Sequence, residues 1–319
     1  MRRPRLRTFI VAGLAAGGAV AAKRSIDARV ASWSTNHDTC AGDPLRLPDG
    51  EAVTVRAADG ATLHGIDCGE GPTVLLVHCW TGNPGFWGPV ACRLVDAGFR
   101  VVAVTQRGHG ASDRGDAPYS PETLGDDVRT WLETLDLHDV VLSGHSMGGL
   151  ASMALATGHP DVARDRVRGL VLVATLASPP SDPRRPDLDI SRLLPLADFV
   201  YRRGDLGLFG LLGVFGTRPA RSQLEAARDG FLDADPVTRR EAAEMMTRFD
   251  LRPDLPGVDL PTTVVAGTHD QLTPLALNED IAERIPGARL EVLHGLGHML
   301  PWEAPDQVTD VIVQTAKPA

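Results

Sequence analysis

The chain has 319 residues, of which 43% are hydrophobic and 23% are charged, a composition typical of globular proteins with a substantial core. Its length fits one large α/β domain or two ordinary domains. The formal net charge is -9 at pH 7, whereas nucleic acid binding normally needs a basic surface that neutralises phosphates. Composition therefore excludes wholesale disorder, and the charge argues against a nucleic acid partner.

Residues 1–24 have the pattern of an export or anchoring segment. Four arginines within the first seven residues precede an uncharged, Ala- and Gly-rich stretch at 8–22, and Lys23 and Arg24 follow it. A basic start, an apolar run and small residues are typical of a secretory signal peptide, although a full membrane span needs about 20 apolar residues. We therefore expect a signal or membrane anchor and a location in the cell envelope or outside the cell. A simple N-terminal arm on a cytoplasmic protein is the alternative.

Strand and helix patterns alternate along the rest of the chain. A polar linker at 25–50 leads into two short strands at 52–56 and 62–67, which flank Asp59-Gly60 and predict a hairpin. Short apolar strand patterns then recur at 73–78, 100–105, 139–143, 168–174, 262–266 and 289–293, with helical patterns at 86–97, 121–137 and 147–157 between them. This order predicts an α/β fold, with a mostly parallel eight-stranded sheet and helices on both faces.

One long interval lacks any strand pattern. Residues 178–255 contain a Pro-rich run followed by helical patterns, and this length is too great for a loop. We expect a helical lid inserted between two core segments, 51–177 and 256–319, over the carboxyl ends of the strands. Its stretch at 206–215 is strongly apolar and rich in glycine, which indicates packing against the body, the wall of an acyl pocket, or contact with a membrane. The glycines would also suit a mobile lid.

The strongest motif in the sequence lies at residues 144–148, Gly-His-Ser-Met-Gly, between a strand pattern and a helical pattern. This G-x-S-x-G arrangement in that context predicts a nucleophile elbow, in which a sharp turn exposes the hydroxyl of Ser146. The flanking Gly144 and Gly148 would permit the turn and a close approach of the backbone. Ser146 is therefore the predicted nucleophile.

A serine nucleophile needs a histidine base and an acid that orients it. Asp270 follows the strand pattern at 262–266, and His298 follows the pattern at 289–293, so both fall where strands end and in the order acid before histidine. His269 and His294 lie close by, but they fit a loop and a strand end better. The predicted triad is Ser146, Asp270 and His298.

The four cysteines are Cys40, Cys68, Cys79 and Cys92, and their spacing matches no zinc or CxxC pattern. Cys79 and Cys92 fall on predicted core elements, so buried free thiols are expected there. A disulfide between Cys40 and Cys68 is an alternative if the protein is exported.

Residues from about 52 to 315 resemble the α/β-hydrolase superfamily, in the branch of small esterases, lipases and haloperoxidase-like enzymes with a helical cap. The resemblance rests on the elbow, the acid and histidine motifs in their order, and residues 106–112, Gln-Arg-Gly-His-Gly-Ala-Ser, after the second apolar strand. It implies that the backbone N–H groups of Trp80 and Met147 form an oxyanion hole. The triad and these donors suffice for catalysis, so no metal or organic cofactor is implied.

Three positions near the motifs call for comment. Cys79 stands where the family usually has glycine, and we expect a packing residue there, with a reactive thiol as the alternative. Gln106 stands where the family often has aspartate, a change expected to alter a structural hydrogen bond. Arg107 is expected to stabilise its loop rather than bind substrate.

These features predict a serine hydrolase that cleaves carboxylic esters, which could be lipid-derived, with a medium-length acyl chain in an aliphatic pocket. A serine at position 146 excludes relatives that need a carboxylate nucleophile. The alternatives are an acyltransferase or perhydrolase, a thioesterase, an aminopeptidase, and a non-catalytic binding protein of the same fold. An aminopeptidase would need an acidic lid residue, for which the candidates are Asp187, Asp189, Asp198 and Asp205.

Overall fold

The computed structural model describes residue 25, residue 28 and residues 31–40, 42–179, 190–211 and 213–317. The predicted signal or anchor at 1–24 lies outside these described residues. Within them, no helix combines the length and the apolar character needed to cross a bilayer.

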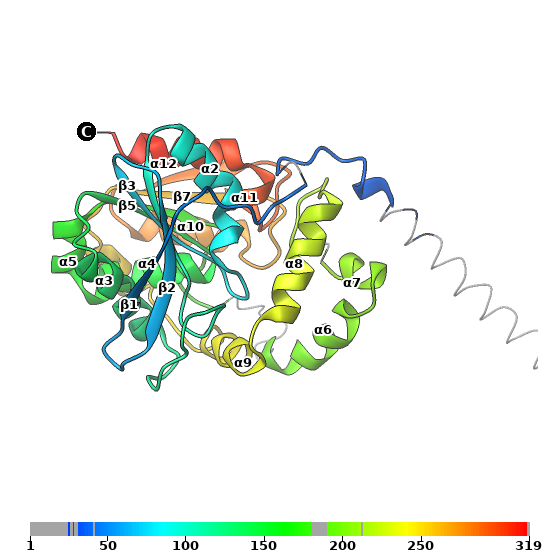
Figure 1. Cartoon of the computed structure of the whole chain (residues 1–319), viewed down its shortest axis with the longest axis horizontal. Coiled ribbons are helices and arrows are strands. Elements are labelled where there is room, and N and C mark those ends of the chain that lie inside the picture. The colour runs from blue at the N-terminus through cyan, green and yellow to red at the C-terminus, as the bar shows by residue number, and fades with distance from the viewer. Residues whose placement is uncertain are drawn as a thin grey trace, which may run out of the picture.

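An eight-stranded sheet forms the centre of the molecule (Figure 1). Its strands are β1 (Glu51–Arg56), β2 (Thr62–Cys68), β3 (Thr73–Val77), β4 (Arg100–Val104), β5 (Val140–His145), β6 (Val167–Val173), β7 (Thr262–Gly267) and β8 (Arg289–Leu293). They lie in the order β1-β2-β4-β3-β5-β6-β7-β8. Strand β2 runs antiparallel to both neighbours, and the six strands from β4 to β8 are parallel. The predicted fold class is confirmed.

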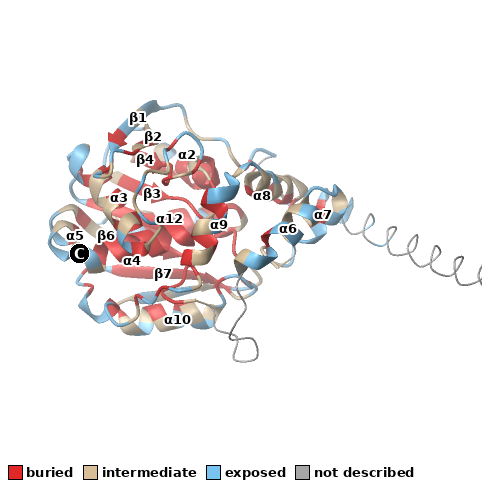
Figure 2. Ribbon diagram, turned by 90° about the horizontal axis from the view of Figure 1, so that it is seen from below, coloured by how far each residue is buried: buried red, intermediate tan, exposed pale blue. Residues whose placement is uncertain are grey.

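Helices cover both faces of the sheet, as the continuous apolar strands require. One face carries α3 (Pro121–Thr134), α4 (Met147–Gly158), α5 (Pro160–Arg166) and α10 (Leu275–Arg284), with the 3-10 turn η3 (Leu255–Gly257). The other carries η1 (Pro84–Trp87), α2 (Gly88–Asp96), α11 (Leu300–Glu303) and α12 (Pro305–Thr315). Figure 2 shows the sheet buried between these layers.

Some predicted boundaries shift. The helix predicted at 121–137 ends at Thr134, because the chain turns at Asp136, which adopts a positive φ of 47°. The helix predicted at 86–97 begins at Gly88, after the 3-10 turn. Strand β5 runs on to His145, so that Ser146 follows the strand directly.

The described part of the interval between β6 and β7 is helical. It contains η2 (Ile190–Leu193), α6 (Leu194–Tyr201), α7 (Asp205–Phe209), α8 (Arg221–Asp233) and α9 (Pro236–Met245). Figure 1 shows these helices grouped at one end of the sheet. An apolar cluster joins them to the body, with Leu208, Leu211 and Phe215 of the interval packed against Phe86 and Trp302. We call this group of helices the lid.

Candidate active site

Ser146 lies at a strained turn between β5 and α4. Its backbone has φ 55° and ψ -117°, a region that a residue with a side chain adopts only when its surroundings enforce it. The Ser146 N–H donates to the Val173 carbonyl at 2.9 Å, and the Thr175 hydroxyl donates to the Ser146 carbonyl at 2.7 Å. Strand β6 and the residues after it therefore hold the turn that presents the Ser146 hydroxyl.

The glycines around Ser146 are required by close backbone packing. A Cβ at Gly148 would lie 2.1 Å from the carbonyl oxygen of Val77, and one at Gly144 would lie 2.3 Å from the carbonyl oxygen of Gly148. Both distances are far inside van der Waals contact. The first turn of α4 also leaves backbone N–H groups without intrahelical acceptors, including that of Met147. The positive end of the helix thus lies beside the hydroxyl.

Asp270 and His298 are in direct contact. The Nδ1–H of His298 donates to Oδ2 of Asp270 at 2.8 Å, and both side chains are almost completely buried. Oδ1 of Asp270 accepts backbone N–H bonds from Leu272 and Thr273, each at 2.8 Å. Burial alone would raise the pKa of Asp270, but the neighbouring His298 and the bonds from Thr273 hold the pKa below its usual value. Asp270 is thus an ionised group that fixes the orientation of the His298 imidazole through Nδ1.

His145 connects the serine turn with the histidine loop. Its Nε2–H donates to the carbonyl oxygen of His298 at 2.9 Å, and the centroids of the two rings are 4.9 Å apart. Burial lowers the pKa of His145 to about 3, so the ring is neutral. Among the described residues, no hydrogen bond joins the Ser146 hydroxyl directly to His298. Such contacts often tighten only when substrate binds.

The loop after β3, which carries Trp80, is held by two buried histidines. His78 donates from Nδ1 to the Cys79 carbonyl at 2.7 Å. His109 donates from Nδ1 to a backbone carbonyl and accepts the N–H of Thr81 on Nε2 at 3.3 Å. Thr81 has a positive φ of 57°, and burial lowers the pKa of His109, which keeps the ring neutral and able to accept. This loop is thereby fixed beside the expected oxyanion position.

Glu303 supports the loop that carries His298, and the sequence analysis did not single it out. Its carboxylate accepts N–H bonds from Gly297 and Met299, on either side of His298, at 3.1 to 3.2 Å, and from Gly216 of the lid at 2.7 Å. Burial raises the pKa of Glu303 to about 7, although these N–H donors act in the opposite direction. The available signal was its position five residues after the predicted base, at the end of a Pro-containing helical turn.

A segment of the lid, residues 214–217, lies along the histidine loop, and we call it the lid strap. The N–H of His298 donates to the Val214 carbonyl at 2.7 Å, and the N–H of Thr217 donates to the Gly295 carbonyl at 3.0 Å. A Cβ at Gly297 would lie 2.3 Å from the carbonyl carbon of Phe215. The lid strap and the histidine loop are therefore in direct backbone contact.

Comparison with known proteins agrees with this arrangement. Residues 72–305 match the family model described as alpha/beta hydrolase fold. The chain belongs to that family. It is 31% identical to a non-heme chloroperoxidase of Kitasatospora aureofaciens over 75% of this chain and 90% of that protein.

Solved structures of α/β-hydrolases superpose on most of the chain. A thermophilic esterase from Thermogutta terrifontis is 30% identical, with a TM-score of 0.69 over 83% of this chain and 97% of that one. An esterase from Exiguobacterium antarcticum has a TM-score of 0.72 over 83% of this chain and 99% of that one, at 24% identity, and that likeness concerns the fold. The family and its relatives support a hydrolase.

The three positions singled out near the motifs have structural contacts. Cys79 is buried among lid and core side chains, and burial raises its pKa to about 12, which leaves the thiol protonated. Gln106 donates from its amide to the His78 carbonyl. Arg107, also buried, forms a bidentate ion pair with Asp127 and a further bond to Asp59 at 3.0 Å. The structure thus uses Arg107 to tie its loop to the body.

All four cysteines are free, including Cys40 and Cys68, so the disulfide left open from the sequence is absent from the described residues. Cys92 is partly exposed, in contrast to the buried position expected for it. Its place on the outer side of α2 explains the difference.

Trp80 contacts both aromatic and aliphatic parts of the lid. Its ring lies 6.0 Å from that of Phe231, edge to face, and Tyr201 approaches Phe231 at 4.9 Å. The indole N–H of Trp80 donates to the Arg239 carbonyl at 3.2 Å. The aliphatic acyl pocket expected from the composition stays a prediction. The candidate acids Asp198 and Asp205 are paired with Arg239 and Arg221, while Asp187 and Asp189 lie outside the described residues.

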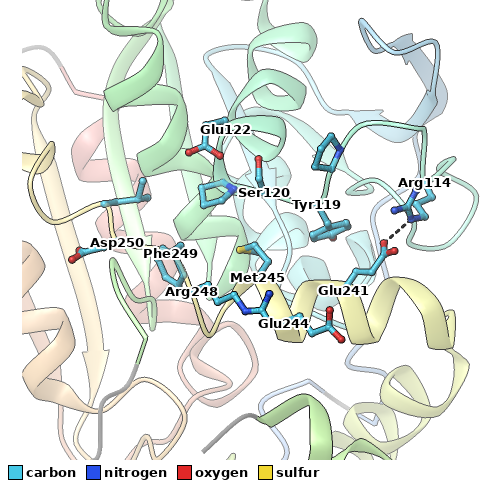
Figure 3. Close-up of a pocket in the computed structure, with 13 residues that line it drawn as sticks. Arg114, Tyr119, Ser120, Glu122, Glu241, Glu244, Met245, Arg248, Phe249 and Asp250 are labelled. Atoms are coloured by element: carbon cyan, nitrogen blue, oxygen red, sulfur yellow. Dashed lines mark hydrogen bonds and ion pairs between the residues drawn. The ribbon is translucent and has the colours of Figure 1, made fainter. Parts of the chain in front are cut away.

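A separate cavity of about 580 Å³ opens between the lid and the body (Figure 3). Arg114, Tyr119 and Glu122 line it from the body, and Glu241 and Arg248 line it from α9 and the residues after it. Arg114 pairs with Glu241 across its edge at 2.6 Å. No triad residue lines this cavity, so we do not assign it to the reaction.

Proposed function

We propose that the protein is a serine hydrolase that cleaves carboxylic esters through an acyl-enzyme on Ser146. The observation that carries the proposal is the 2.8 Å contact between His298 and the buried, ionised Asp270. The strained turn at Ser146 supports it, because the preceding residue, His145, bonds to the His298 carbonyl. A purely structural serine would not need such a strained backbone.

In the proposed first step, Oγ of Ser146 attacks the ester carbonyl carbon while its proton passes to Nε2 of His298. The carbonyl electron pair moves to oxygen, and the N–H groups of Trp80 and Met147 stabilise that oxyanion. Losing one such donor typically lowers the rate by about 10²–10³-fold. The oxyanion then collapses, the bond to the alcohol breaks, and His298 returns the proton to the leaving oxygen.

Deacylation repeats these steps with water. His298 removes a proton from the water as it attacks the acyl carbon, and the proton goes to Oγ of Ser146 as the acid departs. Asp270 stays ionised throughout and stabilises the imidazolium that forms twice in each cycle. Nothing in the cycle requires an oxidant or a metal ion.

Acyl transfer to peroxide is the second candidate, because one relative is named as a non-heme chloroperoxidase. In that reaction, hydrogen peroxide replaces water as the attacking group on the same acyl-enzyme. Thioesters are a further acyl substrate that the same residues would accept. An aminopeptidase is disfavoured, because both described candidate acids of the lid already pair with arginines.

The decisive experiment combines active-site labelling with a substrate panel. A fluorophosphonate probe should label the wild type on Ser146, and Ser146→Ala should abolish both labelling and hydrolysis of p-nitrophenyl esters of increasing acyl length. The matched control is Ser120→Ala, which removes the N-cap side chain of α3 and leaves the candidate site unchanged. This variant should be labelled like the wild type. Two results would overturn the proposal: labelling that persists in Ser146→Ala, or a wild type that hydrolyses none of the esters in the panel.

A further inference from the structure

The outer face of the lid carries an unusual number of exposed apolar side chains. The described residues contain seven large hydrophobic side chains that are exposed, and five of them lie between residues 193 and 209. These five are Leu193, Leu196, Phe199, Leu206 and Phe209, with exposed fractions from 37% to 60%. Exposed apolar patches of a few hundred Å² are often functional. We call them the lid patch.

The helices of the lid separate a buried face from this exposed one. In α6, Leu196 and Phe199 are three residues apart and share one side, and Leu206 and Phe209 have the same spacing in α7. Leu208, from the opposite side of α7, is completely buried in the cluster beneath the lid. Figure 2 shows α6 and α7 exposed at the end of the molecule remote from the sheet. The lid patch is thus an outward face and not part of the lid's attachment.

Two glycines of this stretch allow the two helices to pack closely. A Cβ at Gly207 would lie 2.5 Å from the Tyr201 carbonyl oxygen, and one at Gly210 would lie 3.1 Å from the Tyr201 ring. These contacts hold α7 against α6, so the exposed side chains of the two helices keep a fixed arrangement.

Positive charge accompanies the lid patch although the chain as a whole is acidic. Arg202 and Arg203 follow α6, and Arg218 lies between α7 and α8; all three are exposed, and the described residues supply no carboxylate partner for them. The guanidinium of Arg203 lies 3.1 Å from the centroid of the Phe199 ring. The nearby carboxylates of Asp198 and Asp205 are already paired with Arg239 and Arg221. Exposed apolar side chains on the same helical segment as arginines that have no carboxylate partner among the described residues match the surface of an anionic bilayer.

The N-terminal part of the chain joins the body at the same lid. Trp33 is buried in the cluster between lid and body. The Asn36 side chain donates to the Pro219 carbonyl at 2.7 Å, and the Ser222 hydroxyl donates to the Asp38 carboxylate at 2.6 Å. Figures 1 and 2 agree that the first described residues lie beside α7 and α8. The first described residues of the chain therefore lie against the lid.

We propose that the lid patch docks on the surface of an anionic lipid bilayer, with its leucines and phenylalanines among the acyl chains and its arginines against the headgroups. Stable attachment commonly needs two signals, and the basic and apolar sequence of residues 1–24 is a candidate for the second. The inference concerns binding and stands independently of the reaction at Ser146.

Vesicle binding by the full chain tests this assignment. The probes are vesicles of phosphatidylcholine with and without phosphatidylglycerol, and the bound fraction is measured by co-sedimentation over a range of lipid concentrations. The test variant is Leu196→Gln with Phe199→Gln. The matched control is Val237→Gln with Leu272→Gln, which removes the other two exposed large hydrophobic side chains. All four positions are on the surface, so folding should persist.

The expected result is at least a tenfold loss of vesicle partitioning in the test variant and no change in the control. Replacing Arg202 and Arg218 by glutamine should weaken binding about fivefold per residue, and only to the vesicles that contain phosphatidylglycerol. Equal binding of the wild type and the test variant would assign attachment to residues 1–24 alone and overturn the proposal. So would a wild type that binds neither vesicle, or a dimer in sedimentation velocity that the test variant dissociates, because the lid patch would then face a second copy.

Discussion

The buried carboxylate of Glu303 offers a sharp test of how the histidine loop is built. We consider Glu303→Gln, which keeps the size of the side chain and removes its charge. The wild-type carboxylate accepts N–H bonds from Gly216, Gly297 and Met299. An amide keeps one acceptor oxygen and directs an NH₂ group toward one of these donors. The variant therefore removes the ionisation of this site and at least one of its hydrogen bonds.

The magnitude follows from the pKa of Glu303, which burial raises from 4.5 to about 7. A carboxyl group whose folded pKa is raised stabilises the fold fully below its unfolded pKa, and that stabilisation is lost as the pH rises through the folded pKa. Across this window the loss is on the order of 3 kcal/mol, at about 1.36 kcal/mol for each pH unit between the two values. Most of this loss in the free energy of unfolding of the wild type should occur between pH 5 and pH 8.

The assay is urea unfolding of wild type and Glu303→Gln at pH 5 and pH 8. The free energy of unfolding of the variant minus that of the wild type should rise by about 2 to 3 kcal/mol from pH 5 to pH 8. The esterase activity of the variant should also fall about tenfold, chiefly in kcat, because the loop that carries His298 loses a fixed contact. A stability difference that is the same at both pH values would refute the reasoning.

Three further outcomes are expected. Gly297→Ala should destabilise the fold by about 2 kcal/mol or more and lower kcat, because its Cβ would lie 2.3 Å from the carbonyl carbon of Phe215. The control Gly158→Ala, whose Cβ would have no atom within 4 Å, should leave stability unchanged. Melting curves of Gly297→Ala and wild type that coincide would refute the contact. His109→Phe removes the acceptor of the Thr81 N–H and should lower kcat about tenfold with little change in KM; unchanged kcat in a steady-state assay would count against it. A maleimide at pH 8 should modify only Cys92 in the native protein, as mass spectrometry can show, because burial raises the pKa of Cys79 to about 12.

Much of the fold and three of the site positions could be predicted from the sequence for a local reason. Parallel strands buried on both faces are short, continuous apolar runs, so each strand was visible by itself. Chemistry in such sheets occurs where strands end, and Ser146, Asp270 and His298 all follow strand patterns directly. The structure places Asp270 against His298 at 2.8 Å and Ser146 at the strained turn, although their roles in catalysis stay predictions.

The remaining features depend on contacts between distant segments. Glu303 looks like an ordinary helical glutamate in the sequence, and only the fold directs its carboxylate at N–H groups of the histidine loop and the lid. Likewise, no local sequence pattern indicates that Gly216 and Gly297, which are far apart in the chain, pack against each other. Residues 206–209 were visible in the sequence as an apolar run. The sequence could not show that Leu208 is buried while Leu206 and Phe209 are exposed.

The lid strap changes how this lid can work. Its backbone bonds to the histidine loop, at Val214 and Thr217, and the Glu303 carboxylate joins both segments. Moving the strap would break the backbone bonds at His298 and Gly295 and displace the proposed base, so opening the lid at that edge would disrupt the candidate site. We therefore expect substrate access on the side where Trp80 meets Phe231 of α8 and the Arg239 carbonyl of α9. Gly297 packs against Phe215 and Gly216 of the strap, so this inner edge of the lid is part of the structure that positions the imidazole.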